Sequence, residues 1–412
     1  MDDVNDSMVL RPKLSPVIDF GQMPIANAFL SESEFDSIKK GLKWEYSYNM
    51  VLGFDPETHA IGLVNTVPQE MMFHDHYAFF SSTSKGMQKH FFETAQALKP
   101  YVGSGVVVEI GSNDGIMLEA WKELGIPAVG VEPSANVART SRERGHNVIN
   151  AFMNMATVHA ILESYGVQKR GIYLVFAANV SCHIEELGAY LSCISQLIGK
   201  HGIFVCEDPY FLDIVQKTSY DQIYDEHVWY FTISFMNTML ESLGLHVFHC
   251  EHIDVHGGEL RMYIGHRDTH KETPAVAEWR ARETDIELKL LLLERNIKAS
   301  REKLRDILYG LKKSGKTLCG FGASSKGVIV ANYCGITPEL IPYVTDNTPA
   351  KQGMYYPGMH IPVIPQEEFK KRNPDYALLF VWNHLKEIQK YQKWFEEGGG
   401  KWITHVPNPR II

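Results

Sequence analysis

The segment from residue 219 to residue 232, SYDQIYDEHVWYFT, gathers side chains that can move a proton. Tyr224, Asp225, Glu226 and His227 set an imidazole beside two carboxylates and a phenol. A carboxylate next to a histidine orients the ring and raises its basicity, which suits proton transfer near neutral pH. The segment therefore indicates a proton-transfer site, and the alternative is a polar loop whose histidine is only hydrogen-bonded.

Two further segments place polar side chains where an open α/β sheet binds its ligands. In AANVSCHIEEL, Asn179 and His183 follow the apolar run IYLVF, and such sheets bind ligands outside the carboxyl ends of their strands. His183 could equally cap the helix that follows. In HGGELR, His256 precedes Gly257 and Gly258, which allow either close approach of a substrate or a β-bulge.

A glycine-punctuated turn between a strand and a helix is predicted for residues 106–115, VVVEIGSNDG. Three valines, Glu109 and Ile110 lead into the turn, Gly111 permits positive φ, and Asn113 and Asp114 suit a polar turn and helix cap. The spacing differs from the G-x-G-x-x-G fingerprint, which favours a ligand other than NAD. Glu132, in AVGVEPS, stands at the tip of the next strand, where a carboxylate can accept both hydroxyls of a ribose. This pattern resembles class I methyltransferases that use S-adenosylmethionine, and the alternative is any α/β domain with a glycine turn.

The chain divides into four parts around this turn. Residues 1–75 carry prolines between short β-like runs and predict a small irregular lobe that packs against the central domain. Residues 76–268 alternate strands and helices, which predicts a largely parallel sheet of seven strands whose last two form an antiparallel pair. Residues 269–315 predict a helical connector, and residues 316–412 a second α/β domain. We therefore expect an α/β protein with two Rossmann-like sheets.

An aromatic patch precedes the first helix of the central domain. Tyr77, Phe79 and Phe80 lead to a helix that Ser82 or Ser84 can cap. Such aromatic side chains belong to a core more often than to a site. Tyr77 could nevertheless reach a reacting atom, because it lies just before the helix that leads to the glycine turn.

The connector and the second domain have their own patterns. In the connector, Leu288, Leu292, Ile297 and Leu304 are among the periodic apolar positions, which predicts one long helix or two with a solvated charged face. The second domain opens with TLCGFGASSKG, a strand followed by a glycine-rich turn. Its amides could hold a phosphate near Lys326, and a plain strand-to-helix turn is equally compatible with these residues.

Composition narrows the possible partners. The 412 residues include 40 basic and 49 acidic ones, a formal charge of −9 without a basic block, so we expect no nucleic-acid partner. Apolar runs such as YALLFVW are strand-length, which predicts no membrane span, and no signal peptide is evident. The six cysteines are scattered without a C-x-x-C pair, so we expect reduced thiols in a cytoplasmic protein and no metal site among them.

Across nearly its whole length the chain resembles the sugar C-methyltransferases that act on nucleotide-linked 4-keto-6-deoxy sugars. The blocks that carry the resemblance are PIANAFL, YAFFSSTS, EIGSNDG, GVEPS, ANVSCH, YDQIYDEH, HGGELR, GFGASSKG, NYCGI, VTDNTPAKQGMYYPGMHIPV and DYALLFVWN. The resemblance implies a transferase of deoxysugar and natural-product biosynthesis. In that reaction a base removes the C3 proton, which the 4-keto group acidifies, and the enolate attacks the methyl group of S-adenosylmethionine.

The resemblance also assigns roles to residues. It implies that His227 is the base, flanked by Tyr224 and Glu226, with His183 and Tyr77 as weaker candidates. The residues implied to bind S-adenosylmethionine are Glu109, Gly111, Asn113, Glu132, Pro133, Phe152 and Asn179. Those implied to bind the nucleotide sugar are His256, Gly322 and Lys326.

The sequence departs from this family in its N-terminal part. Members usually hold zinc there through paired C-x-x-C ligands, whereas this chain has no cysteine before Cys182. We therefore expect no zinc and a lobe held by packing alone. Phe79 replaces the second tyrosine of the family's Y-x-Y. These differences keep two other hypotheses open, namely O-, N- or C-methylation of another small molecule and a non-catalytic binding subunit.

Overall fold

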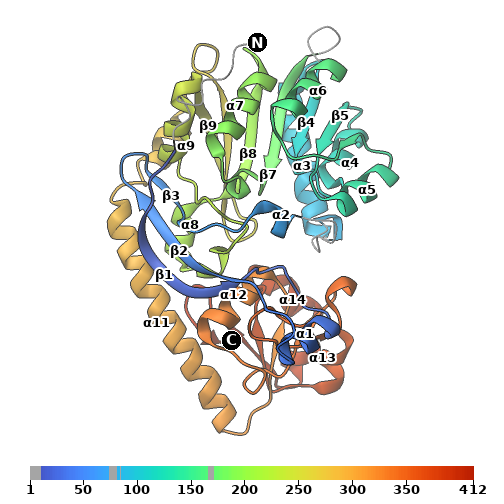
Figure 1. Ribbon diagram of the computed structural model, residues 1–412, viewed down its shortest axis with the longest axis vertical. Coiled ribbons are helices and arrows are strands. Elements are labelled where there is room, and N and C mark those ends of the chain that lie inside the picture. Colours follow the sequence, from blue (N-terminus) through green and yellow to red (C-terminus); the bar gives the residue numbers. More distant parts are fainter. Residues whose placement is uncertain (1–10, 74–80, 84, 166–170) are drawn as a thin grey trace.

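The computed structural model describes residues 11–73, 81–83, 85–165 and 171–412, which form three β-sheets with helices packed around them (Figure 1). This confirms the predicted α/β class, with a small N-terminal sheet, a seven-stranded central sheet and a C-terminal α/β sheet. The chain runs from the N-terminal sheet through the central sheet and then along a long helix to the C-terminal sheet.

The N-terminal sheet is antiparallel, with its strands in the order β1-β2-β3. Its elements are β1 (Ser15–Pro24), α1 (Glu32–Lys39), β2 (Ser47–Asp55), β3 (Ala60–Leu63) and α2 (Gln69–Met72). It touches the central domain, where the amide of Leu63 donates to the carbonyl of Val228 at 2.8 Å. It also packs on the C-terminal domain, because Met50 and Leu52 share one buried cluster with residues of that domain, and Phe35 stacks on Tyr355 at 4.3 Å.

The central sheet has the strand order β6-β5-β4-β7-β8-β10-β9, and only β10 runs antiparallel to its neighbours. The strands are β4 (Val106–Ile110), β5 (Ala128–Val131), β6 (Val148–Ile149), β7 (Ile172–Ala178), β8 (Ile203–Pro209), β9 (Leu245–Ile253) and β10 (Glu259–His266). The helices are α3 (Lys85–Val102), α4 (Ile116–Glu123), α5 (Ala135–Glu143), α6 (Met155–Tyr165), α7 (Leu187–Ile198), α8 (Phe211–Lys217) and α9 (Ile233–Leu240). The antiparallel pair that β9 and β10 form at the end of the sheet confirms the predicted topology.

Both faces of this sheet are buried, which explains the uninterrupted apolar run of β4. Val106, Val108 and Ile110 belong to one buried cluster, while Val107 belongs to another. Successive side chains of a strand point to opposite faces, so each face of β4 needs its own apolar residues. Glu109, the second-to-last residue of this strand, is the exception, because it places a carboxyl group in the buried interior.

Two helices, α10 (Pro274–Arg280) and α11 (Ile286–Lys313), connect the two larger sheets, and α11 runs along one side of the molecule (Figure 1). Ile297 and Leu304 are buried on the inner face of α11. Leu288 and Leu292 have exposed fractions of 55% and 37%, so they lie on the outer face. The buried stripe instead continues through residues such as Leu290 and Leu293.

The C-terminal sheet has the order β13-β12-β11-β14-β15-β16, and all its pairs are parallel except the last. Its strands are β11 (Leu318–Phe321), β12 (Val344–Asp346), β13 (Val363–Pro365), β14 (Tyr376–Leu379), β15 (Lys401–Thr404) and β16 (Arg410–Ile411). Its helices are α12 (Ser325–Cys334), α13 (Glu367–Arg372), α14 (Leu385–Tyr391) and α15 (Lys393–Glu397). The glycine-rich turn lies between β11 and α12.

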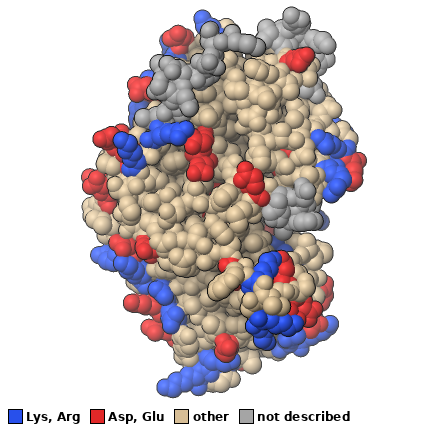
Figure 2. Space-filling model, viewed as in Figure 1, with Lys and Arg blue, Asp and Glu red and all other residues tan. Residues whose placement is uncertain are grey.

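On the surface drawn in Figure 2, basic and acidic side chains are interspersed over both larger domains. Among the helices of the described residues, none combines the length and the apolar character that crossing a bilayer requires.

Candidate active site

A cavity of about 380 Å³ lies where the N-terminal lobe, the central sheet and the C-terminal sheet meet. The predicted site residues that line it are Glu109, Gly111, Asn113, Glu132, Pro133, Phe152, Asn179, His183, Tyr224, Glu226, His227, His256 and Lys326. Gly322 is not among the lining residues, and its carbonyl accepts a hydrogen bond from the hydroxyl of Tyr356 at 3.3 Å. Tyr77 lies outside the described residues.

One end of the cavity is built by the turn between β4 and α4. Gly111 has a φ of +69°, and a Cβ there would come within 2.3 Å of Val180, so the turn requires glycine. The carboxylate of Glu132 accepts hydrogen bonds from the amide of Asn113 at 3.0 Å and from the amide of Ser134 at 2.8 Å. These bonds fix the tip of β5 against the turn.

Glu109 adds a buried acid to this end. Burial raises its pKa well above the ordinary value, and the nearby carboxylates of Glu132 and Asp114 raise it further. The protonated form of this group is therefore favoured more strongly than in an exposed glutamic acid. Its Oε2 atom is buried and has no hydrogen-bond partner within the described part of the chain, so this acid can donate to a ligand.

Asp114 holds the segment before α3 against the same turn. It accepts hydrogen bonds from the hydroxyl of Ser81 at 3.0 Å and from the amide of Ser82 at 3.2 Å, and the hydroxyl of Ser82 also donates to it. Asn113 accepts from the amide of Ser81 at 3.1 Å. The sequence predicts Asp114 only as a residue of the polar turn and helix cap and assigns no role to Ser81, although an aspartate in a turn is a common acceptor for backbone amides.

The loop before α9 supplies the middle of the cavity wall. The hydroxyl of Tyr224 and Nε2 of His227 share a hydrogen bond of 2.9 Å, and the ring centroids of His183 and His227 are 5.3 Å apart at an angle of 27°. Phe73 stacks on the other side of His183 at 5.5 Å. The three rings hold His227 in one orientation inside the site.

The predicted rise in the basicity of His227 is wrong. Burial lowers its pKa well below the ordinary value, and the neighbouring His183 and Lys326 lower it further. Burial also lowers the pKa of His183 to about 3. For His227 only a backbone hydrogen bond with Gln222 acts in the other direction, and it does not outweigh desolvation, so both rings are neutral at pH 7.

The two carboxylates beside His227 in the sequence bind the N-terminal lobe. Asp225 accepts a hydrogen bond from the amide of Ala26 at 2.9 Å, and Glu226 accepts one from the side-chain amide of Asn27 at 2.5 Å. Burial, and then the charge of Glu226, raises the pKa of Asp225 to about 8. The lobe thereby completes the wall of the cavity.

Two lysine side chains, Lys351 buried and Lys326 partly buried, form the wall that the C-terminal domain contributes. Nζ of Lys326 donates to the carbonyl of His256 at 2.8 Å, and Nζ of Lys351 donates to the carbonyl of Ala323 at 2.8 Å. Burial lowers the pKa of both lysines. Lys351 was missed by the sequence analysis, and the available signal was its position in a polar loop after a strand of the second domain.

The HGG segment packs closely against its surroundings. A Cβ at Gly258 would come within 2.4 Å of the carboxyl group of Asp213, and one at Gly257 within 2.9 Å of the Trp382 ring. The sequence left substrate approach and a β-bulge open as alternatives, whereas the contacts here show that the glycines permit close packing against other parts of the chain. Glu259 then accepts hydrogen bonds at 2.8 Å from the side-chain amide of Asn179 and shares one of 2.8 Å with Nδ1 of His256.

Asp221 ties the loop before α9 to the C-terminal domain. Nε1 of Trp382 donates to its Oδ2 at 2.7 Å, and Nε2 of His405 lies 3.3 Å from the same atom. Burial raises the pKa of Asp221, but the charge and hydrogen bond of His405 outweigh this effect, so its pKa is lowered. The loop that carries His227 is thus held from both outer domains.

Comparisons with known proteins match the two larger parts of the chain separately. Residues 87–249 match the family model described as a methyltransferase domain, and residues 254–407 match the model described as a C-methyltransferase C-terminal domain. The chain is 29% identical over 404 residues to C-methyltransferase NovU of Streptomyces niveus, which covers 96% of this chain and 94% of that protein.

Solved methyltransferase structures are similar to a smaller share of the chain. Magnesium protoporphyrin IX methyltransferase ChlM of Synechocystis, solved with bound S-adenosylmethionine, is 11% identical with a TM-score of 0.32. That match covers 44% of this chain and 80% of the other. A SAM-dependent methyltransferase of Archaeoglobus fulgidus is 22% identical with a TM-score of 0.31, over 40% of this chain and 74% of the other.

Proposed function

This chain is an S-adenosylmethionine-dependent C-methyltransferase related to NovU, and on that premise we propose that it methylates C3 of a nucleotide-linked 4-keto-6-deoxy sugar. The observation that carries the proposal is that one cavity contains a neutral imidazole, the turn at Glu132 and two lysines of the C-terminal domain. A base thus lies between a place for the methyl donor and a place for an anionic acceptor.

The donor end of the cavity fits S-adenosylmethionine. Gly111 lines this end of the cavity, and Glu132 stands where a carboxylate can accept the hydroxyls of a ribose. The buried Oε2 of Glu109 can form a hydrogen bond with a ligand, and Pro133 and Phe152 present an apolar surface for adenine. When bound, S-adenosylmethionine supplies an electrophilic methyl group.

A carbon nucleophile requires a base, because a C–H bond must lose its proton before carbon can attack a methyl group. A 4-keto group acidifies the proton at C3. In our proposal His227 takes this proton at the imidazole, and the hydrogen bond with Tyr224 keeps the ring in the orientation that this transfer needs. His183 packs against His227 and helps to orient the keto sugar.

The cavity wall that carries Lys326 and Lys351 favours a nucleotide-linked acceptor over an uncharged one. Lys326 and Lys351 each donate to one backbone carbonyl, and each ammonium has three N–H donors. A buried charge is stabilised when it gains a charged partner. The diphosphate of a nucleotide sugar would provide that partner, which leads us to place the nucleoside diphosphate on the C-terminal side of the cavity.

The proposal can be tested by incubating the protein with S-adenosylmethionine labelled in its methyl group and a panel of thymidine diphosphate 4-keto-6-deoxy sugars. Mass spectrometry should show one labelled methyl group on the sugar, and fragmentation should place it at C3. Binding of S-adenosylmethionine without turnover of any nucleotide sugar would contradict the proposal. Methylation of an uncharged acceptor would instead support the hypothesis of another small-molecule substrate.

A further inference from the structure

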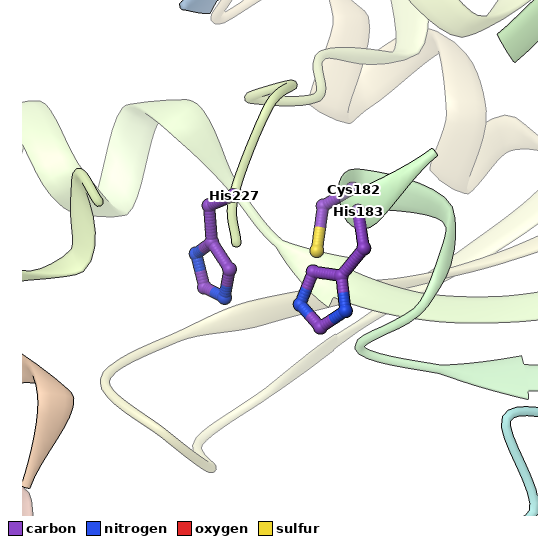
Figure 3. Close-up of side chains that lie close together, drawn as sticks. All are labelled: Cys182, His183 and His227. Atoms are coloured by element: carbon purple, nitrogen blue, oxygen red, sulfur yellow. The ribbon is translucent and has the colours of Figure 1, made fainter. Parts of the chain in front are cut away.

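Cys182, His183 and His227 bring a thiol and two imidazoles together beside the cavity, and Figure 3 shows their side chains directed toward a common point. Each offers one ligand atom, and these atoms all lie within 4.8 Å of one another. We infer that the three side chains form a binding site for a thiophilic divalent cation such as Zn²⁺, and that a cation bound there withholds His227 from proton transfer. The second half of this inference rests on the proposed function.

The ligand set suits zinc. Thiolate sulfur and imidazole nitrogen are its usual protein ligands, and three protein ligands leave a fourth position open. With bonds of about 2.0–2.3 Å, the ligand atoms of a tetrahedral zinc ion lie about 3.3–3.6 Å apart. The three ligand atoms here lie within 4.8 Å of one another, so side-chain rotations that move them by about 1 Å bring them to that spacing.

The surroundings of these three side chains give two further reasons to expect that a cation binds there. Nε2 of His183 is buried and has no hydrogen-bond partner among residues 11–73, 81–83, 85–165 and 171–412, so a metal bond would satisfy an otherwise unpaired atom. Asp208 and Glu259 contribute negative charge beside Cys182, which offsets the positive charge that Lys326 brings to the His227 side.

Folding alone assembles this group. Cys182 and His183 belong to the short turn after β7, whereas His227 comes from the loop before α9. The two segments are joined by hydrogen bonds from the amides of Val228 and Trp229 to the carbonyl of Cys182, at 2.8 Å and 3.1 Å. The two parts of the site are therefore held in a fixed relation, as a preformed cation site requires.

When the cation binds, one covalent bond to a hydrogen atom is broken. The S–H bond of Cys182 breaks, a metal–sulfur bond forms, and one proton passes to the solvent, while both imidazoles bind through lone pairs. A lone pair of His227 that is bonded to a metal is not available to a proton. Zinc should therefore inhibit methyl transfer reversibly, and a chelator should restore it.

Cobalt(II) provides a test that is independent of activity, because a tetrahedral cobalt–thiolate site has intense near-ultraviolet and visible absorption. Titration of the full chain with Co²⁺ should produce these bands with one equivalent bound. Cys182→Ser, with Cys182→Ala as a second variant, should lose the sulfur-to-metal band and bind at least 10-fold more weakly. Cys193→Ser is the matched control, since Cys193 is also buried but lies on α7 outside the group, and it should bind like the wild type.

Activity measurements then separate the two halves of the inference. Zn²⁺ should inhibit methyl transfer by the wild type and by Cys193→Ser, and Cys182→Ser should be at least 10-fold less sensitive while it keeps its activity without metal. An unchanged cobalt spectrum in folded Cys182→Ser would overturn the site. A cobalt site without inhibition by zinc would overturn its effect on His227, and a wild type inactive on every keto sugar would count against the proposed function alone.

Discussion

The side-chain amide of Asn27 donates a hydrogen bond of 2.5 Å to Oε1 of Glu226, a residue 199 positions later in the chain. Through this bond the N-terminal lobe reaches the loop that carries His227. The amide of Ala26 binds the adjacent Asp225 at 2.9 Å, so two consecutive carboxylates are held by two consecutive residues of the lobe. The lobe therefore contributes to the wall of the cavity as well as packing on both larger domains.

Removal of the Asn27 amide should impair catalysis more than stability. A hydrogen bond to a charged group contributes about 1.5–3 kcal/mol, so Asn27→Ala should lower kcat by about 10-fold or more if this bond positions the loop. The affinity for S-adenosylmethionine, measured by calorimetry, should stay unchanged, and Asn27→Gln should restore part of the rate. Asn65→Ala is the control, since Asn65 is exposed on the same lobe and donates to the carbonyl of Asn49. Equal kcat values for Asn27→Ala and wild type would contradict this role.

Replacement of the proposed base should abolish the chemistry without preventing binding. His227→Asn keeps a polar side chain but has no imidazole, and general-base catalysis typically contributes about 10²–10⁴-fold to a rate. Methyl transfer should fall by that factor, and so should exchange of the C3 hydrogen of the keto sugar with deuterated water, followed by NMR. If deuterium exchange continues at the wild-type rate in the variant, His227 is not the base.

The loss of one buried ammonium should weaken binding of the anionic acceptor only. Lys351→Met removes the charge but keeps an unbranched chain of similar length, so KM for the nucleotide sugar should rise about 10-fold or more, with an unchanged Kd for S-adenosylmethionine. Lys316→Met offers a comparison, because Lys316 is exposed in the same domain and pairs with Asp375 at 3.3 Å. A KM for Lys351→Met that equals that of Lys316→Met would place the diphosphate elsewhere.

Two glycines with nearly equal backbone conformations allow strain to be separated from crowding. Gly111 has φ +69° and Gly125 has φ +70°, but a Cβ at Gly125 would meet nothing within 4 Å, whereas one at Gly111 would meet Val180 at 2.3 Å. Both alanine variants should lose about 1–2 kcal/mol of unfolding free energy to the left-handed conformation. Only Gly111→Ala should also lose affinity for S-adenosylmethionine, which a calorimetric titration of the two variants can show.

Acid stability should depend on Glu207. Arg261 donates to its Oε1 at 2.7 Å and His90 lies 2.7 Å from its Oε2. Burial raises the pKa of Glu207, but the hydrogen bond of His90 and the charge of Arg261 outweigh it, so the pKa is lowered. A lowered carboxyl pKa contributes stability that is present above the unfolded pKa, about 4.5, and is lost as the pH falls through the folded pKa.

Glu207→Gln should therefore unfold more easily at pH 7, by about 1.5–3 kcal/mol, because it removes the charge from one of the two carboxylates that bind the buried Arg261, while Glu251 remains. Below pH 4.5 the difference from wild type should shrink. Glu294→Gln, which breaks the exposed pair with Lys298, should change the free energy of unfolding by less than about 1 kcal/mol. Urea unfolding at several pH values measures both effects, and a constant difference between pH 7 and pH 3 would rule out this account.

Local patterns in the sequence were sufficient for the architecture. The alternating strands and helices predicted the central sheet and its antiparallel end, and the turn at Gly111 was found from its spacing alone. These features depend on neighbouring residues, because strand and helix periods repeat within a few positions and a left-handed turn requires glycine wherever it occurs. The periodic leucines of the connector likewise predicted a helix.

The burial, the pKa and the contact partners of individual side chains were decided by the tertiary structure. Leu288 and Leu292 face solvent because the domains that α11 joins cover its other face. The neighbours of His227 in the sequence predicted a more basic ring, yet burial by three domains lowers its pKa. Desolvation sums over every atom that excludes water, most of them distant in sequence, so partners such as Asn27 and Lys351 became visible only in the folded chain.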